Sequence, residues 1–70
     1  MGMEEITFEG YALELENEIG KWYWDFKANA FQPDYHFNQY CIGAKWEAIN
    51  KNKEIPDGKV RQVSCKIVFN

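Results

Sequence analysis

Two runs of alternating apolar residues flank a short polar stretch in the first half of the chain, and this arrangement constrains the fold most. Leu13 and Leu15 alternate with glutamates, and Trp22 and Trp24 alternate with lysine, tyrosine and aspartate. An apolar residue at every second position is typical of a strand with one buried face. The stretch between the runs, 17–20, ends in glycine, which suits the last position of a hairpin loop. We therefore predict a β-hairpin with residues 17–20 as its loop.

The register of this hairpin follows from the same pattern. A four-residue loop pairs Leu15 with Trp22 on one face and Glu16 with Lys21 on the other. A slip by one residue would place Glu16 opposite Trp22 and bury a carboxylate among apolar side chains, which costs free energy. The first register is therefore the one we expect.

A break in the alternation precedes the hairpin. Phe8 and Tyr11 both suit a core position, although they lie three residues apart, and Gly10 stands between them. One extra residue in the strand would restore the pattern. This spacing predicts a β-bulge at Gly10.

The second half of the chain predicts one helix and one strand. Residues 42–52 suit a helix despite one glycine, and Ala44 and Ala48 lie four residues apart on one helical face. The sequence Ile-Pro-Asp-Gly at 55–58 predicts a turn. Alternating apolar residues over 63–69 predict a last strand.

Segment 28–41 leaves two alternatives open. Pro33 excludes a central strand around itself, and residues 35–41 suit either a short strand or the first turns of a helix.

The remaining elements give one α+β domain, residues 1–70, in the order β-β-α-β. We expect a three-stranded antiparallel sheet in the order 2-1-3, with one helix packed on one face and the other face open to water. The expected core consists of Leu13, Leu15, Trp22, Trp24, Phe26, Ala48, Cys65 and Ile67.

Composition excludes several classes of protein. A chain of 70 residues with 46% hydrophobic residues is too apolar for a disordered segment. Its longest apolar run is far below the roughly 18 residues of a membrane span, and no signal-peptide pattern is present. The net charge of -3 argues against a protein that binds the phosphate backbone in bulk. We expect a cytoplasmic protein with Cys41 and Cys65 reduced.

Catalytic signals are nearly absent. His36 is the only histidine, and its spacing from Cys41 and Cys65 matches no nucleophilic pair. Two cysteines cannot complete a tetrahedral zinc site, and the scattered glycines form no phosphate-binding loop. We expect no enzyme, no metal and no cofactor.

Two groups of residues are candidates for binding a partner. Glutamates alternate at the end of the hairpin's first strand, which suits either a solvated edge or a contact with a basic surface. Aromatic residues are 17% of the chain and gather between positions 31 and 46, where they suit either the core or an exposed anchor. The candidate binding residues are Glu14, Glu16, Glu18, Tyr23, Tyr35, Phe37 and Trp46.

Two segments resemble parts of small sheet-plus-helix DNA-binding modules. They are residues 20–22, which enter a strand, and residues 44–48, which lie on a helix. The arm-binding domains of phage integrases and plant ethylene-response domains are such modules, and their sheets carry arginines into the major groove. The corresponding face carries Glu14, Glu16 and Asp25 here, and Arg61 is the only arginine. Nucleic acid is therefore not the expected partner.

These observations favour a small, acidic, non-enzymatic protein-binding module. A basic surface of another protein is the expected partner, and an inhibitor or adaptor encoded by a phage or another mobile element is a setting that fits size and charge. Two alternatives stay open. One is a nucleic-acid-binding module that uses Tyr23 with Lys21, Lys27 and Lys66 on one sheet face; the other is a structural homodimer.

Overall fold

A computed structural model describes residues 4–69 of the chain. The first part contains strands β1 (Glu4–Glu16), β2 (Lys21–Asp25) and β3 (Ala30–Pro33). Two 3₁₀ turns, η1 (Asp34–His36) and η2 (Gln39–Cys41), lead to helix α1 (Lys45–Glu54) and strand β4 (Lys59–Phe69). All neighbouring strands are antiparallel, and their order is β3-β2-β1-β4. The α+β class, the single helix and the sub-order β2-β1-β4 confirm the prediction, whereas the expected number of three strands is wrong.

The additional strand β3 follows β2 through a tight turn that side chains stabilise. The Asp25 carboxylate accepts hydrogen bonds from the backbone N–H groups of Lys27 and Ala28, at 2.9 and 2.8 Å. Asn29 adopts a left-handed φ of 59°, which asparagine tolerates better than most residues. Pro33 ends β3, which is an edge strand. The N–H group that proline lacks is therefore not needed for a hydrogen bond between two interior strands.

The β1–β2 hairpin has the predicted register. Leu15 lies opposite Trp22, and Glu16 lies opposite Lys21. The Asn17 side chain accepts hydrogen bonds from the backbone N–H groups of residues 19 and 20 and thereby closes the loop. Gly20 has a φ of 156°, a value that residues with a side chain rarely adopt.

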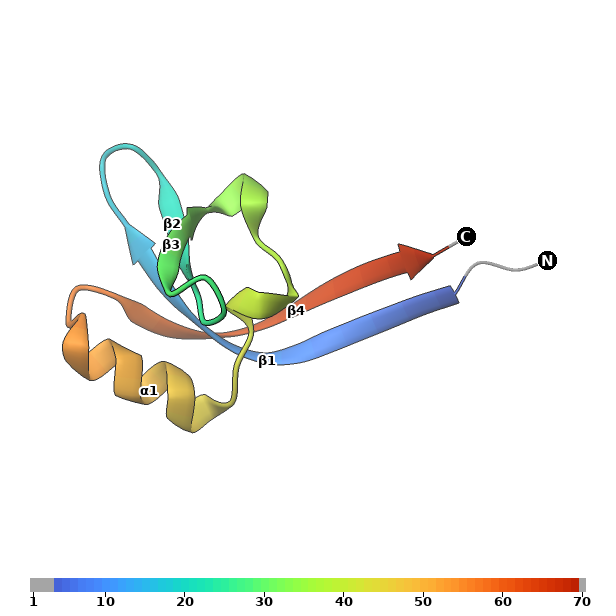
Figure 1. Ribbon diagram of the computed structural model, residues 1–70. Coiled ribbons are helices and arrows are strands. Elements are labelled where there is room, and N and C mark those ends of the chain that lie inside the picture. The colour runs from blue at the N-terminus through green and yellow to red at the C-terminus, as the bar shows by residue number, and fades with distance from the viewer. Residues whose placement is uncertain (1–3, 70) are drawn as a thin grey trace.

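Helix α1 covers one face of the sheet (Figure 1). Leu13 and Ala48 are fully buried there, and the Lys51 ammonium lies 4.7 Å from the centre of the Trp24 ring. The helix begins at Lys45, later than predicted, because Gly43 exchanges two backbone hydrogen bonds with Tyr11, of 2.8 and 2.9 Å. This extended pairing uses the backbone groups that a longer helix would need.

The opposite face of the sheet is covered as well, which corrects the expectation that it is open to water. Residues 34–42 fold over it in the two 3₁₀ turns, on the other side of the sheet from α1 (Figure 1). Ala12 and Cys41 are fully buried, and Asp25 is nearly so. The Phe26 N–H donates to the Tyr40 carbonyl at 2.9 Å. The open question about residues 35–41 is thereby answered: residues 35–36 and 39–41 lie in the two 3₁₀ turns, and residues 37–38 connect them.

Beyond this body, β1 and β4 continue as a two-stranded ribbon. Within the described residues, positions 4–10 of β1 pair with β4 alone, and the ribbon extends away from the rest of the molecule (Figure 1). The molecule is therefore elongated, at 47 × 27 × 19 Å.

The ribbon also shows that the predicted bulge at Gly10 is wrong. Pairing with β4 runs without interruption from Glu9 through Gly10 to Tyr11. The apolar residues instead change faces: Leu13 and Val60 face α1, whereas Phe8 and Cys65 lie on the opposite face. Of the expected core, Leu13 and Ala48 are buried; the half-buried members are Leu15, Trp22, Trp24, Phe26, Cys65 and Ile67, the last two on the other face of the sheet.

Candidate protein-interaction surface

One face of the ribbon is apolar from Ile6 to Gly10 of β1. The register pairs Ile6 with Ile67 and Phe8 with Cys65, and Val63 lies opposite Gly10. Because side chains alternate between faces, these residues share one side of the ribbon. We call Ile6, Phe8, Val63, Cys65 and Ile67 the ribbon strip.

The ribbon strip lies at the molecular surface. Ile6 is 46% exposed and Phe8 is 36% exposed, and the other three residues are half-buried. Apart from Val68, the other face of the ribbon is polar and carries Glu5, Thr7, Glu9, Ser64 and Lys66. The Glu5 carboxylate and the Lys66 ammonium lie 3.7 Å apart on that face. The ribbon is therefore amphipathic, although no helix or turn among residues 4–69 packs against the outer half of its apolar side.

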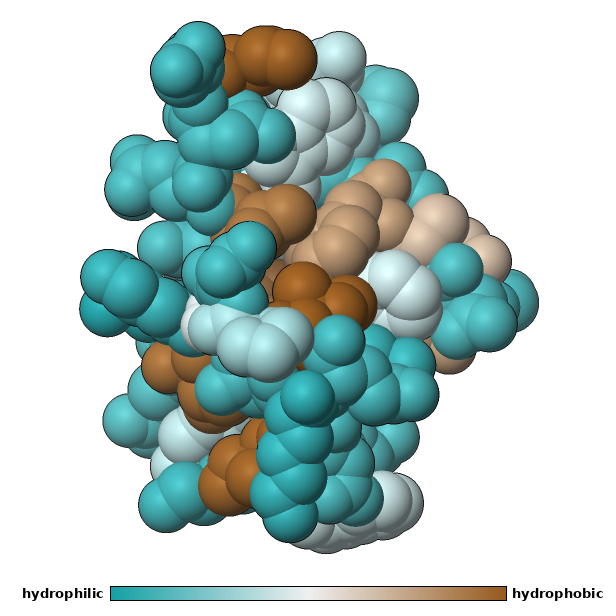
Figure 2. All heavy atoms as spheres, turned by 90° about the vertical axis from the view of Figure 1, so that its left-hand side faces the viewer, coloured by the Kyte–Doolittle hydropathy of each residue, from teal (hydrophilic) through white to brown (hydrophobic). Residues whose placement is uncertain are grey.

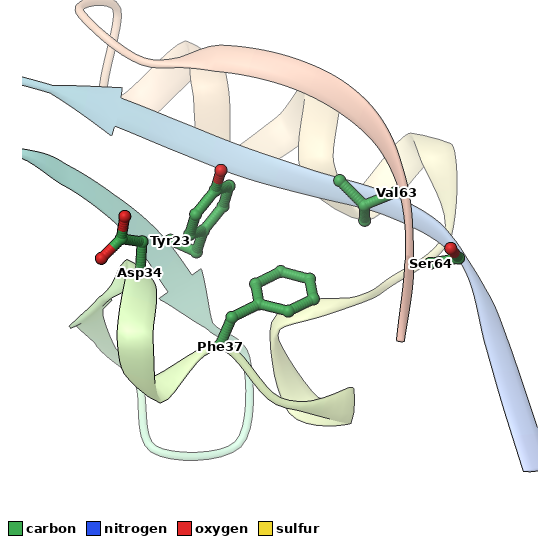
Figure 3. Close-up of a pocket in the computed structure, with 5 residues that line it drawn as sticks. All are labelled: Tyr23, Asp34, Phe37, Val63 and Ser64. Carbon is green, nitrogen blue, oxygen red and sulfur yellow. The ribbon is translucent and has the colours of Figure 1, made fainter. Parts of the chain in front are cut away.

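An aromatic pair continues the strip toward the body of the molecule. The rings of Tyr23 and Phe37 meet edge to face, with centroids 4.9 Å apart. They line a pocket of about 320 Å³ together with Asp34, Val63 and Ser64. Figure 3 shows the Phe37 ring between Tyr23 and Val63, so the pair and the strip form one continuous surface.

Tyr23 is fixed in this position by a hydrogen-bond network below the pocket. Its hydroxyl donates to Oε2 of Glu14 at 2.9 Å, and Nε of Arg61 donates to Oε1 of the same carboxylate at 3.3 Å. Burial disfavours the phenolate, and the hydrogen bond and negative charge of Glu14 add to this effect, so the pKa of Tyr23 is raised to about 12. At neutral pH the phenol is protonated and acts as a donor.

The structure brings together only part of the predicted binding residues. Tyr23 and Phe37 are in contact, and Glu14 lies beneath them with 8% exposure, satisfied by internal partners. Glu16 is exposed at the end of β1, and Glu18 lies in the following loop, outside the strand on which alternation was expected to place it.

The other two predicted anchors lie apart from the Tyr23–Phe37 pair. Tyr35 is 79% exposed and packs edge to face against His36 in η1. Trp46 is 65% exposed on α1, which covers the other face of the sheet. Figure 2 views the molecule from the end opposite the ribbon tip, and its hydrophobic residues form separate groups among hydrophilic ones.

Sequence reasoning missed the ribbon strip as a surface. It assigned Cys65 and Ile67 to the core because they alternate as a buried strand face does. The available signal was the odd spacing of Phe8 and Tyr11, which marks the position where the apolar side chains change faces. A bulge and a change of face produce the same sequence pattern, so the pattern alone could not separate them.

Over residues 4–69, no three His, Cys, Asp or Glu side chains are grouped to hold a metal ion. His36 lies in an exposed turn, and both cysteines are free thiols. Burial raises the pKa of the Cys41 thiol, which disfavours the nucleophilic thiolate. No helix within the described residues has the length and apolar character to cross a membrane.

Comparison with known proteins gives no relative from which a function could be transferred. No protein-family model, curated protein or solved structure matches this chain.

Proposed function

We propose that this chain is a non-enzymatic protein-binding module whose binding surface is the ribbon strip together with the Tyr23–Phe37 pair. The observation that carries the proposal is the uncovered apolar face of the ribbon. Both faces of the main sheet are covered, one by α1 and one by residues 34–42. A two-stranded ribbon is only marginally stable in water without a further layer, and contiguous exposed apolar surface is typical of interaction sites. A bound protein supplies that layer.

The chemistry of the surface indicates the chemistry of the partner. The strip carries no charged side chain, so its partner contributes apolar or aromatic residues at the centre of the contact. Of the three glutamates predicted to contact a basic partner surface, Glu16 and Glu18 remain candidates. The Glu14 carboxylate already accepts hydrogen bonds from Tyr23 and Arg61. An inhibitor or adaptor role in a phage or another mobile element, and a cytoplasmic setting, stay predictions from the sequence.

The nucleic-acid alternative has less support. Lys66 lies on the other face of the ribbon from Tyr23, which corrects the expectation that they share a face. The Lys27 ammonium lies 4.4 Å from the centre of the Tyr40 ring. The Tyr23 ring packs against the Phe37 ring. It is therefore less available for stacking on a nucleic-acid base.

An affinity experiment with three baits tests the proposal. The baits are the wild-type chain, Phe8→Asp in the strip, and the matched control Thr7→Asp, which places the same charge on the adjacent residue of the opposite face. We expect a protein from the source cell to bind the wild type and Thr7→Asp and to be lost from Phe8→Asp. Circular dichroism of each bait checks that it is folded.

Two results would contradict the proposal. One is a partner that binds folded Phe8→Asp as well as the wild type, because the strip is then not the contact. The other is tight, salt-resistant retention of single-stranded nucleic acid with no protein bound.

A further inference from the structure

We infer that the outer edge of β4 binds an extended, acidic segment of a partner protein, which adds to the sheet as a further antiparallel strand. Strand β4 is the last in the order β3-β2-β1-β4, so it has β1 on one side and, among residues 4–69, no strand on the other. The ribbon strip consists of side chains on a face, whereas this edge consists of backbone groups. The inference therefore goes beyond the proposed function.

The hydrogen bonds of Tyr11 show which backbone groups of β4 point outward. The Tyr11 N–H donates to the Gly43 carbonyl at 2.9 Å, and the Tyr11 carbonyl accepts from the Gly43 N–H at 2.8 Å, so both groups point away from β4. Because backbone groups alternate between the two sides of a strand, Gly10 bonds to β4, through its partner Val63. The outward N–H and C=O groups of β4, which we call the β4 edge, belong to the alternate residues Val60, Gln62, Ser64, Lys66 and Val68.

The β4 edge has no hydrogen-bond partner within residues 4–69. Outside the strand ladders, no backbone or side-chain hydrogen bond reaches the backbone of residues 59–69. Gln62, Ser64 and Lys66 are exposed, and Val68 is 50% exposed, so the edge is open to solvent over the ribbon. A row of unpaired N–H and C=O groups is the template on which a further strand adds.

The charges of β4 favour an acidic strand as the occupant. The strand carries Lys59, Arg61 and Lys66 and no acidic residue. Basic side chains on an edge disfavour pairing with another basic strand, which includes β4 of a second copy. Opposite charges on neighbouring strands attract each other. The edge therefore disfavours its own copy and admits an acidic segment.

Strand β1 shows that β4 accepts such a partner on its inner side. It contains several glutamates and no basic residue, and it pairs antiparallel with β4 over 4–14. The Glu5 carboxylate lies 3.7 Å from the Lys66 ammonium, and Glu14 lies opposite Lys59. The Lys66 side chain is still 59% exposed, so it can meet a second carboxylate on the outer side. A strand with the charge pattern of β1 therefore fits the β4 edge.

A synthetic peptide with the sequence of residues 4–14 tests the inference, because β1 already fits β4. The control peptide has the same sequence with every glutamate replaced by lysine. Isothermal titration calorimetry measures the binding of each peptide to the purified chain. We expect the acidic peptide to bind at least about tenfold more tightly than the lysine peptide. The difference should shrink as the salt concentration rises.

Two variants test whether the backbone and the charge of the edge are used. Ser64→Pro removes one outward N–H group and leaves the hydrogen bonds between β1 and β4 in place. Its matched control, Ser64→Ala, loses the hydroxyl and keeps the N–H. We expect the acidic peptide to bind Ser64→Pro about tenfold more weakly than it binds the wild type and Ser64→Ala. Lys66→Glu, which alters no backbone group, should weaken binding of the acidic peptide and strengthen binding of the lysine peptide. Circular dichroism checks that each variant is folded.

Amide hydrogen exchange of the chain with the acidic peptide locates the contact. Exchange should slow at residues 60, 62, 64, 66 and 68 and stay unchanged in β1. Faster exchange in β1 would overturn the inference, because the peptide would then replace β1 and not add beside β4.

Three other results would overturn the inference as well. They are an acidic peptide that does not bind, equal binding of the two peptides, and undiminished binding by folded Ser64→Pro. None of these results decides whether the ribbon strip binds a protein, because Phe8→Asp tests the face and Ser64→Pro tests the edge.

Discussion

At the residue scale, Glu14 links the two strands that flank β1. Its carboxylate accepts a hydrogen bond from Tyr23 of β2 and another from Arg61 of β4. It is nine-tenths buried, so its loss would leave the Tyr23 hydroxyl without its acceptor in a half-buried position. The alternation of glutamates predicted an outward contact here, but a residue with two inward partners stabilises the sheet.

Replacing Glu14 should therefore lower stability. We expect Glu14→Ala to reduce the free energy of unfolding by about 2 kcal/mol, the scale of hydrogen bonds to a charged group. The control Glu16→Ala removes a carboxylate from the same face where it is exposed, and should change stability by less than about 0.5 kcal/mol. Urea denaturation measures both values, and equal effects would show that Glu14 is no more than a surface charge.

The raised pKa of Tyr23 predicts a pH dependence. The folded state holds the phenol proton to about pH 12, whereas the unfolded chain releases it near the ordinary value of 10.0. The stabilising contribution is therefore complete below pH 10 and is lost as the pH rises from 10 to 12. Ultraviolet titration of the four tyrosines should show one late ionisation, which Tyr23→Phe should remove. A late ionisation that persists in Tyr23→Phe would assign it to another tyrosine.

At the scale of elements, the position of Gly10 joins the ribbon to the body. A Cβ atom there would lie 2.7 Å from the carbonyl oxygen of Gly43 and 2.8 Å from Cγ2 of Ile42. The segment between η2 and α1 therefore packs directly on the β1 backbone, and Gly43 completes the contact through its two hydrogen bonds with Tyr11. Glycine is required by this close approach and not by a bulge.

Gly10→Ala should push residues 42–43 away from β1. We expect a loss of about 1–3 kcal/mol, as for other overpacked sites. Glu9→Ala, on the neighbouring exposed residue, is the control and should be nearly neutral. Thermal unfolding compares the two variants. A Gly10→Ala variant as stable as the wild type would show that residues 42–43 do not pack this closely on the β1 backbone.

The sequence predicted those elements whose signal is local. The hairpin register followed from Leu15, Trp22 and the loop glycine, and the last strand followed from its own alternation. Strand β3 was missed because its turn depends on the Asp25 side chain and on a left-handed Asn29, which leave little trace in the apolar pattern. The ribbon surface was missed because Cys65 and Ile67 alternate in the same way whether their face of the sheet is covered or exposed. Residues 34–42 cover that face over the main sheet, and which part of a face a distant segment covers is not encoded locally.

At the scale of the whole molecule, the chain consists of a covered sheet and an uncovered ribbon. The acidic strand β1 and the basic strand β4 pair along eleven positions, which brings the two ends of the described chain together. Opposite charges favour this pairing over a pairing of like strands. We expect another protein chain to bind the apolar face of the ribbon that this pairing forms.

Amide hydrogen exchange would show whether the ribbon is the surface that a protein partner covers. It should be measured on the purified chain at low and high concentration, and again with any protein that the wild-type bait retains. We predict that binding slows exchange in residues 4–10 and 63–69 and leaves the loop at 17–20 and helix α1 unchanged. Slower exchange confined to the loop or to α1 around Trp46, with the ribbon unchanged, would contradict it.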